Sequence, residues 1–151
     1  MKEVDQDEAI INLNLSGDGQ PFANRRGKMT LPVKGKLKHT YGSQRIAGKL
    51  TWDGIVITAQ EGTPVTAVHH GRVIFSDYMR SHGLLLIIDH GDGYMSLYAN
   101  NQTLSKDLGD WVGSGDVIAR LGSTGGQSYP GLYFEIRHQG QPVNPRHWFS
   151  K

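Results

Sequence analysis

The sequence predicts an all-β fold, a mostly antiparallel curved sheet whose concave face forms a groove, with few or no long helices. Two observations predict it. Short apolar and β-branched runs alternate with turn residues, and glycine occupies 20 of the 151 positions, which is typical of a chain with many tight turns. No segment of the body carries the apolar spacing of a helix of ten or more residues.

The strands are expected in order along the body. Residues 63–68 and 71–75 are short and β-branched, and residues 84–89 form a continuous apolar run typical of a buried strand. Gly91-Asp92-Gly93 is a hairpin signal that should return the chain as a strand over 94–100. Residues 116–121 and 132–137 complete the set, while residues 102–108 hold one turn at most.

Side chains alternate between the two faces of a strand, which sorts the last strand into two sets. Gly131, Tyr133 and Glu135 should point to the groove, and Leu132, Phe134 and Ile136 to the core. By the same rule Tyr94, Ser96, Tyr98 and Asn100 share one face of their strand, which we assign to the groove.

A chain of 151 residues is expected to form one domain. Residues 1–28 are predicted to be a flexible tail or linker remnant, with linker-like stretches at 16–20 and 24–27, and residues 29–151 form the domain. Within the tail, Ile11, Leu13 and Leu15 alternate with asparagines and suggest a short strand. The tail is therefore either a mobile leader or a segment that docks in or beside the groove.

Charge and hydropathy exclude some functions. A formal net charge of +2, without a Lys/Arg run interleaved with aromatics, does not favour nucleic-acid binding. No stretch approaches the ~20 apolar residues of a membrane span, so direct membrane insertion is not expected. The acidic start carries no export signal, and the chain shows no heptads.

Two motifs carry the functional prediction. Residues 52–56 (Trp-Asp-Gly-Ile-Val) and 131–135 (Gly-Leu-Tyr-Phe-Glu) resemble the metal-binding motifs His-x-Gly-x-Asp and His-x-His-Phe-Glu of the LytM-type (M23) zinc endopeptidases. The resemblance extends from about Leu31 to the end of the chain. Trp52, Val56 and Tyr133 stand at the positions where the motifs of the family have zinc ligands. Two further family histidines are replaced by Gly131 and Asn100.

These replacements cannot bind zinc. A catalytic zinc takes three ligands from His, Asp, Glu or Cys and keeps a position for water. Val56 offers no lone pair, the indole of Trp52 only donates, and the phenol of Tyr133 is protonated at neutral pH. We therefore expect no metal, no cofactor and no catalytic residue, and a chain that is not an enzyme.

Among the degenerate members, the chain is most similar to the murein-hydrolase activators of the Gram-negative periplasm. That resemblance implies a non-catalytic domain that switches on a zinc-dependent N-acetylmuramoyl-L-alanine amidase during septal cell-wall splitting. It also implies a periplasmic location. An export signal, an upstream coiled coil and a division-site membrane complex then belong to the full-length protein rather than to this chain.

The amidase is expected to bind the degenerate groove. Trp52, Val56, Tyr98, Asn100 and Tyr133 should form its floor, with Asp53 and Arg137 at the rim. The complete predicted partner-binding set is Trp52, Asp53, Val56, His82, Leu85, Tyr98, Asn100, Tyr133 and Arg137. An apolar floor with a polar rim is typical of protein recognition.

Other interpretations stay open. The groove could hold peptidoglycan stem peptide without cutting it, as a binding module, or relocated ligands could support residual hydrolysis. Glu135 is expected to anchor a backbone turn rather than to act in acid–base chemistry. The seven histidines show no ligand spacing, His69 and His70 should diverge, and His90 should cap backbone groups.

Overall fold

The computed structural model describes residues 18–46 and 50–150, and the expectation of an all-β fold is confirmed. Over that part of the chain the only helical elements are two 3-10 turns, η1 (Phe22–Arg25) and η2 (Pro145–Trp148). None of its helices is long and apolar enough to cross a membrane.

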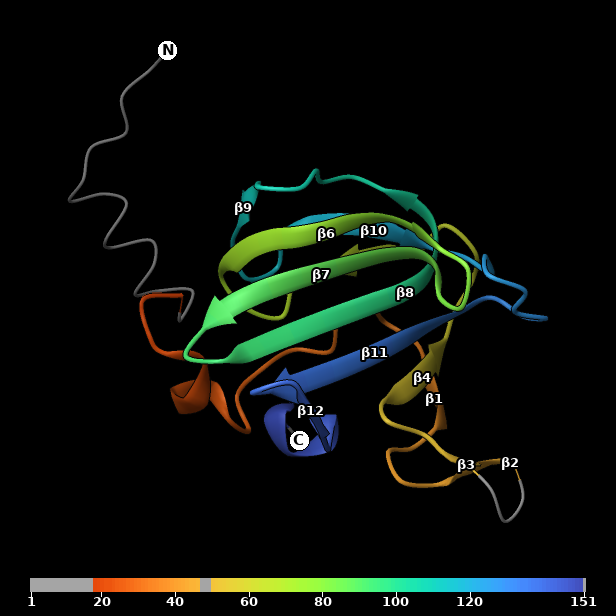
Figure 1. Cartoon of the computed structure of the whole chain (residues 1–151), viewed down its shortest axis with the longest axis horizontal. Helices are drawn as coiled ribbons and strands as arrows, with labels where there is room; N and C mark the ends of the chain where they lie inside the picture. Colours follow the sequence, from red (N-terminus) through yellow and green to blue (C-terminus); the bar gives the residue numbers. More distant parts are fainter. Residues whose placement is uncertain (1–17, 47–49, 151) are drawn as a thin grey trace.

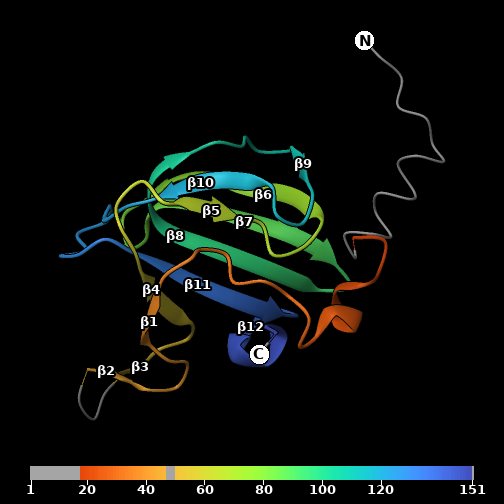
Figure 2. The same cartoon turned by 180° about the vertical axis from the view of Figure 1, so that it is seen from behind.

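A single antiparallel sheet organises the molecule (Figure 1). Its strands run in the order β1 (Lys36–His39), β4 (Ile55–Thr58), β11 (Gly131–His138), β8 (Tyr94–Leu104), β7 (Gly83–Gly91), β6 (Gly71–Met79) and β9 (Trp111–Val112). Seen from behind, β5 (Pro64–Thr66) and β10 (Val117–Leu121) cover part of it, and β10 also pairs with the end of β8 (Figure 2). β12 (Gln141–Val143) pairs with β11, and β2 (Gln44–Ile46) forms a separate hairpin with β3 (Leu50–Thr51).

The hairpin between β7 and β8 forms at the predicted place. Gly91, Asp92 and Gly93 all have positive φ, at 84°, 54° and 81°, a backbone conformation that glycine adopts without steric cost. Strand β8 is longer than predicted. It continues through residues 101–104, where it pairs with β10, so the first part of the 102–108 segment is strand rather than a helical turn.

The sheet has one face on the main core and one face on the groove. The predicted alternation along β11 is confirmed, since Leu132, Phe134 and Ile136 belong to the main core and Tyr133 does not. Strand β4 alternates in the same way, with Ile55 and Ile57 in the main core. A second, smaller apolar cluster lies on the groove face, made by Val56, Leu85, Leu97, Ala99 and Tyr133.

Strand β8 departs from the predicted pattern. Tyr98 lies in the main core, fully buried, with its ring edge-on to Phe134 and its hydroxyl accepting a hydrogen bond from the backbone N–H of Val68. Leu97 and Ala99 face the groove instead. Asn100 has φ +67° and the register with β7 slips there, so a bulge breaks the period-two alternation. The assignment of Tyr98 to the groove floor is therefore wrong.

Part of the predicted tail packs on the domain. Residues 1–17, including the suggested strand at 11–15, lie outside the described residues. Phe22 of η1 is buried against His90, Tyr94 and Trp148. The carboxylate of Asp18 accepts hydrogen bonds from the backbone N–H groups of His70 and Ser114. Residues 18–28 thus differ from the flexible linker expected there. That expectation rested on the glycine, serine and asparagine content of the segment, whereas the buried side chain of Phe22 anchors it to the domain.

Candidate partner-binding groove

A cavity of about 500 Å³ opens on the groove face of the sheet, where the ends of β4, β7, β8 and β11 meet. Six of the nine predicted residues line it: Trp52, Asp53, His82, Asn100, Tyr133 and Arg137. Glu135 also lines it, on the groove side of β11 as the alternation predicted. The remaining lining residues were not singled out by the sequence motifs: Arg45, Ser81, Gly125, Gly126, Gln127, Ser128 and Tyr129.

The other three predicted residues do not reach the surface of the groove. Tyr98 lies on the opposite face of the sheet, as described above. Val56 and Leu85 face the groove side, but they are 0% and 1% exposed and support the floor from beneath. Tyr133 packs in the same cluster and is itself the floor, with an exposed fraction of 7%.

A charged pair lies in the floor that we expected to be apolar: the Glu135 side chain is buried, and that of Arg137 is 34% exposed. The hydroxyl of Tyr133 donates a hydrogen bond to one carboxylate oxygen of Glu135, and Nε of Arg137 donates to the other over 2.7 Å. Burial, and then the hydrogen bond to Glu135, raise the pKa of the Tyr133 phenol, so it remains protonated. The same carboxylate raises the pKa of Arg137. Glu135 therefore holds two side chains in place, and its expected role as an anchor of a backbone turn is wrong.

Aromatic rings and cations form one wall of the groove. Trp52 stacks on His39 at 4.6 Å between ring centroids, and the guanidinium of Arg45 lies 4.4 Å from the centroid of the Trp52 ring. Lys38 is placed similarly over Tyr129, at 4.5 Å. Neither Arg45 nor Lys38 forms an ion pair with another described residue. The indole N–H of Trp52 is buried and has no hydrogen-bond partner among the described residues.

The opposite wall is polar. His82 is half-buried, its Nδ1 lies 2.7 Å from the Ser81 hydroxyl, and burial lowers its pKa. Asn100 donates its side-chain amide to the backbone carbonyl of Thr124. Gln127 donates to the carbonyls of Tyr129 and Gly131, which ties the 125–130 loop to the start of β11. Nothing in the local pattern of polar residues predicts Gln127 or Tyr129 as lining residues, since both lie in a loop without periodicity.

The residues at the ligand positions do not fit a zinc ion. The Val56 side chain is hydrocarbon and fully buried, and the Tyr133 hydroxyl is occupied as a donor to Glu135. The only hydrogen-bonding group of Trp52 is an N–H donor. Within residues 18–46 and 50–150, no three His, Cys, Asp or Glu side chains gather in a way that could hold a metal. The histidines outside the groove are explained by packing: His69 contacts Phe22, His70 stacks on Trp111, and His90 contacts the His70 carbonyl.

Comparison with known proteins settles the family. The model of peptidase family M23 matches residues 50–145, most of the sheet and all of the groove strands. The chain belongs to the M23 family. Its resemblance to the degenerate, activator-like members is confirmed as well, by the relatives described next.

Two curated relatives from Escherichia coli K12 are named as activators. The chain is 48% identical to the murein hydrolase activator EnvC over 150 residues, 99% of this chain and 34% of EnvC. It is 39% identical to the murein hydrolase activator NlpD over 115 residues, 76% of this chain and 29% of NlpD. The chain thus spans about a third of the length of the curated relatives it matches.

Solved structures confirm the fold. The catalytic domain of lysostaphin from Staphylococcus simulans superposes with a TM-score of 0.68 at 23% identity, over 74% of this chain and 89% of that domain. A zinc-containing peptidase from Vibrio cholerae gives a TM-score of 0.73 at 22% identity, over 83% of this chain and 41% of that protein. At these identities the likeness concerns the fold.

Proposed function

We propose that this M23 domain is a non-catalytic activator of peptidoglycan hydrolases. One observation carries the proposal. Trp52, Val56 and Tyr133 occupy the ligand positions of a zinc peptidase fold, where they pack together as an aromatic and aliphatic floor that does not fit a metal. The activator names of EnvC and NlpD support the same function.

The partner that fits best is a zinc-dependent N-acetylmuramoyl-L-alanine amidase of the Gram-negative periplasm, bound through the groove during septal cell-wall splitting. Aromatic side chains and arginines are the residue types that most often dominate binding energy at protein interfaces. The groove presents Trp52, Tyr129, Arg45 and Arg137 around one cavity. A coiled coil elsewhere in the full-length protein, together with a membrane complex at the division site, would bring the domain to the septum.

Activation would follow from a difference in affinity. If an inhibitory helix of the amidase binds this groove more tightly than it binds its own active site, the amidase shifts towards its open state. The shift can be no larger than that difference, so a weakened groove should lower activation in proportion. In this scheme the zinc and the hydrolytic chemistry belong to the partner.

The test is dye release from labelled sacculi at a fixed amidase concentration, with the chain added and with the chain alone. The proposal expects release to rise only when chain and amidase are both present. Hydrolysis by the chain alone would contradict it. Binding to sacculi in the absence of amidase, abolished by Trp52→Ala, would instead favour the peptidoglycan-binding module.

A further inference from the structure

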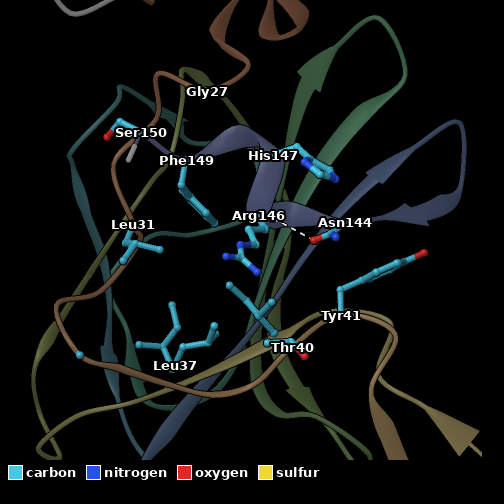
Figure 3. A pocket seen from close by; sticks show the side chains of 13 residues that line it. Gly27, Leu31, Leu37, Thr40, Tyr41, Asn144, Arg146, His147, Phe149 and Ser150 are labelled. Carbon is cyan, nitrogen blue, oxygen red and sulfur yellow. Dashed lines mark hydrogen bonds between the residues drawn. The ribbon is translucent and has the colours of Figure 1, made fainter.

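A second and larger cavity, of about 990 Å³, lies on the other side of β4 from the groove. Ile55 and Ile57 of β4 line it, with side chains that belong to the main core rather than to the groove cluster. Figure 3 shows Leu31 and Leu37 turned towards a common space, which Arg146 enters from η2. Both leucines are exposed, so the cavity presents uncovered apolar side chains in the part of the chain that the structure describes.

Leu37 belongs to β1, which is the edge strand of the sheet on this side. Among the described strands β1 pairs with β4 alone, so the other edge of its backbone is open to a further strand. Its side chains point to both sides of the sheet: Leu37 lines the cavity, whereas Lys38 lies over Tyr129 on the groove side. A strand added to β1 would therefore place its side chains alternately beside Leu37 and beside Lys38.

The surroundings of this edge are basic. The cavity is lined from residues 27–41, 55–57 and 144–150, and none of these positions is Asp or Glu. Residues 19–52 contain eight basic residues and no acidic one, whereas the rest of the chain contains eight basic and fourteen acidic residues. The exposed lysines of the segment form no ion pair with another described residue: Lys28, Lys34, Lys36 and Lys38. The edge is thus complementary to a segment that carries both acidic and apolar residues.

Lysines on an edge strand often serve only to prevent pairing with another copy of the same chain, and a β-bulge has the same effect. β1 has both devices, since its register with β4 shifts between Leu37 and His39. Neither device explains Leu37 itself, which is 51% exposed at an apolar cavity. A second copy also fits poorly as the occupant of this edge, because two β1 strands side by side would bring their lysines together.

We infer that β1 accepts an extended segment of a partner protein, in which acidic and apolar residues alternate, as an added strand of the sheet. The apolar side chains of that segment enter the cavity beside Leu37, and its carboxylates lie beside Lys38. Backbone hydrogen bonds supply affinity in this mode of recognition, and the alternating side chains supply specificity. The inference goes beyond the proposed function, since the cavity and the groove lie on opposite sides of β4.

The probe is a fluorescein-labelled peptide in which glutamate and valine alternate, titrated with the whole chain and followed by fluorescence anisotropy. The peptide should bind saturably, and Leu37→Glu and Lys38→Glu should each weaken its binding by at least about tenfold. The matched charge changes Leu108→Glu and Lys106→Glu, in the loop between β8 and β9, should leave binding at the parent level. A peptide with the same residues arranged as a glutamate block and a valine block should bind at least about tenfold more weakly. Circular dichroism should show all four variants folded.

Hydrogen exchange and N-methylation test the added strand itself. The amide protons of residues 36–39 that point away from β4 should exchange at least about tenfold more slowly in the complex. Methyl groups on alternate peptide amides block one edge of the peptide strand, so only one of the two alternating sets should weaken binding.

Four results would overturn the inference: no saturable binding of the alternating peptide, equal binding of the block peptide, equal losses in the control variants, or equal effects of the two methylated sets. Self-association of the chain that Leu37→Glu abolishes, without peptide binding, would also overturn it and assign the edge to a second copy.

Discussion

The phenol of Tyr133 and the carboxylate of Glu135 are hydrogen-bonded 2.5 Å apart inside the groove floor. Tyr133 stands where the zinc peptidases of this family place a ligand, and its hydroxyl is used to satisfy a carboxylate that is almost fully buried. With Arg137 on the other oxygen, Glu135 is charge-balanced without a metal. Both oxygens of Glu135 therefore have partners within the floor of the groove.

Tyr133→Phe tests that arrangement. It removes one partner from buried Glu135 and keeps the ring, so the free energy of unfolding should fall by about 1–3 kcal/mol while amidase activation is retained. Urea unfolding measures the first and dye release the second. A variant as stable as the parent chain would mean that the hydrogen bond does not stabilise the floor.

Tyr133→Ala should have two effects. It removes the ring from the cluster formed with Val56 and Leu85 and should destabilise the fold by roughly 3–5 kcal/mol. It should also weaken activation, as expected for loss of an aromatic contact residue. Activation must be measured at a temperature where circular dichroism shows the variant folded. Full activation by the folded variant would remove Tyr133 from the proposed interface.

The chain should not bind zinc, and restoring His and Asp at the three ligand positions should not restore hydrolysis. We expect elemental analysis of the purified chain to find no stoichiometric zinc. The triple variant Trp52→His, Val56→Asp and Tyr133→His should still not cleave peptidoglycan cross-links, because Gly131 and Asn100 supply no imidazole and the supporting hydrogen bonds are missing. Measurable turnover by the triple variant would contradict this expectation.

His90 predicts how stability depends on pH. Burial lowers its pKa to about 3, and its Nδ1 donates to the His70 carbonyl while Nε2 lies 2.7 Å from the Ser96 hydroxyl. The unfolded chain, with a pKa near 6.5, therefore binds this proton more readily than the folded chain. Stability should be full above about pH 6.5 and fall towards pH 3, by roughly 2–3 kcal/mol at pH 4.5 from this group.

The variant His90→Gln isolates that contribution. It should be less stable than the parent at pH 7, yet its free energy of unfolding should change less between pH 6.5 and 4.5. Urea titrations at both pH values measure the difference. Parallel pH profiles for the two chains would show that His90 is not the group responsible.

Local pattern predicted most of the sheet, because period-two alternation and glycine turns are short-range signals. β11 shows this well: Leu132, Phe134 and Ile136 lie in the core and Tyr133 in the groove. Tyr98 was misplaced because the bulge at Asn100 arises from a positive φ that no neighbouring glycine announces. The full burial of Val56 and Leu85 depends on which side chains from other strands cover them, and a local sequence pattern does not contain that information.

The groove walls were less predictable than its floor. Arg45 lines the groove where it lies over Trp52, and Lys38 lies over the ring of Tyr129; these contacts join segments without a shared motif. The burial of Glu135 with Tyr133 and Arg137 does follow from their i, i+2, i+4 spacing on one strand face, although we read Glu135 as a turn anchor. Phe22 was missed because a single aromatic within a glycine- and asparagine-containing stretch carries no periodicity.

Two exposed or half-exposed tryptophans provide the most direct test of the proposed amidase-binding groove. Trp52 lines the groove beside β4, and Trp111, 63% exposed, lies on β9 at the other edge of the sheet. Dye release from labelled sacculi, at a fixed amidase concentration, should fall at least about tenfold for Trp52→Ala, the loss of an aromatic hot spot, and stay at the parent level for Trp111→Ala. Circular dichroism should show both variants folded. If folded Trp52→Ala activates the amidase as well as Trp111→Ala does, the groove is not the partner site.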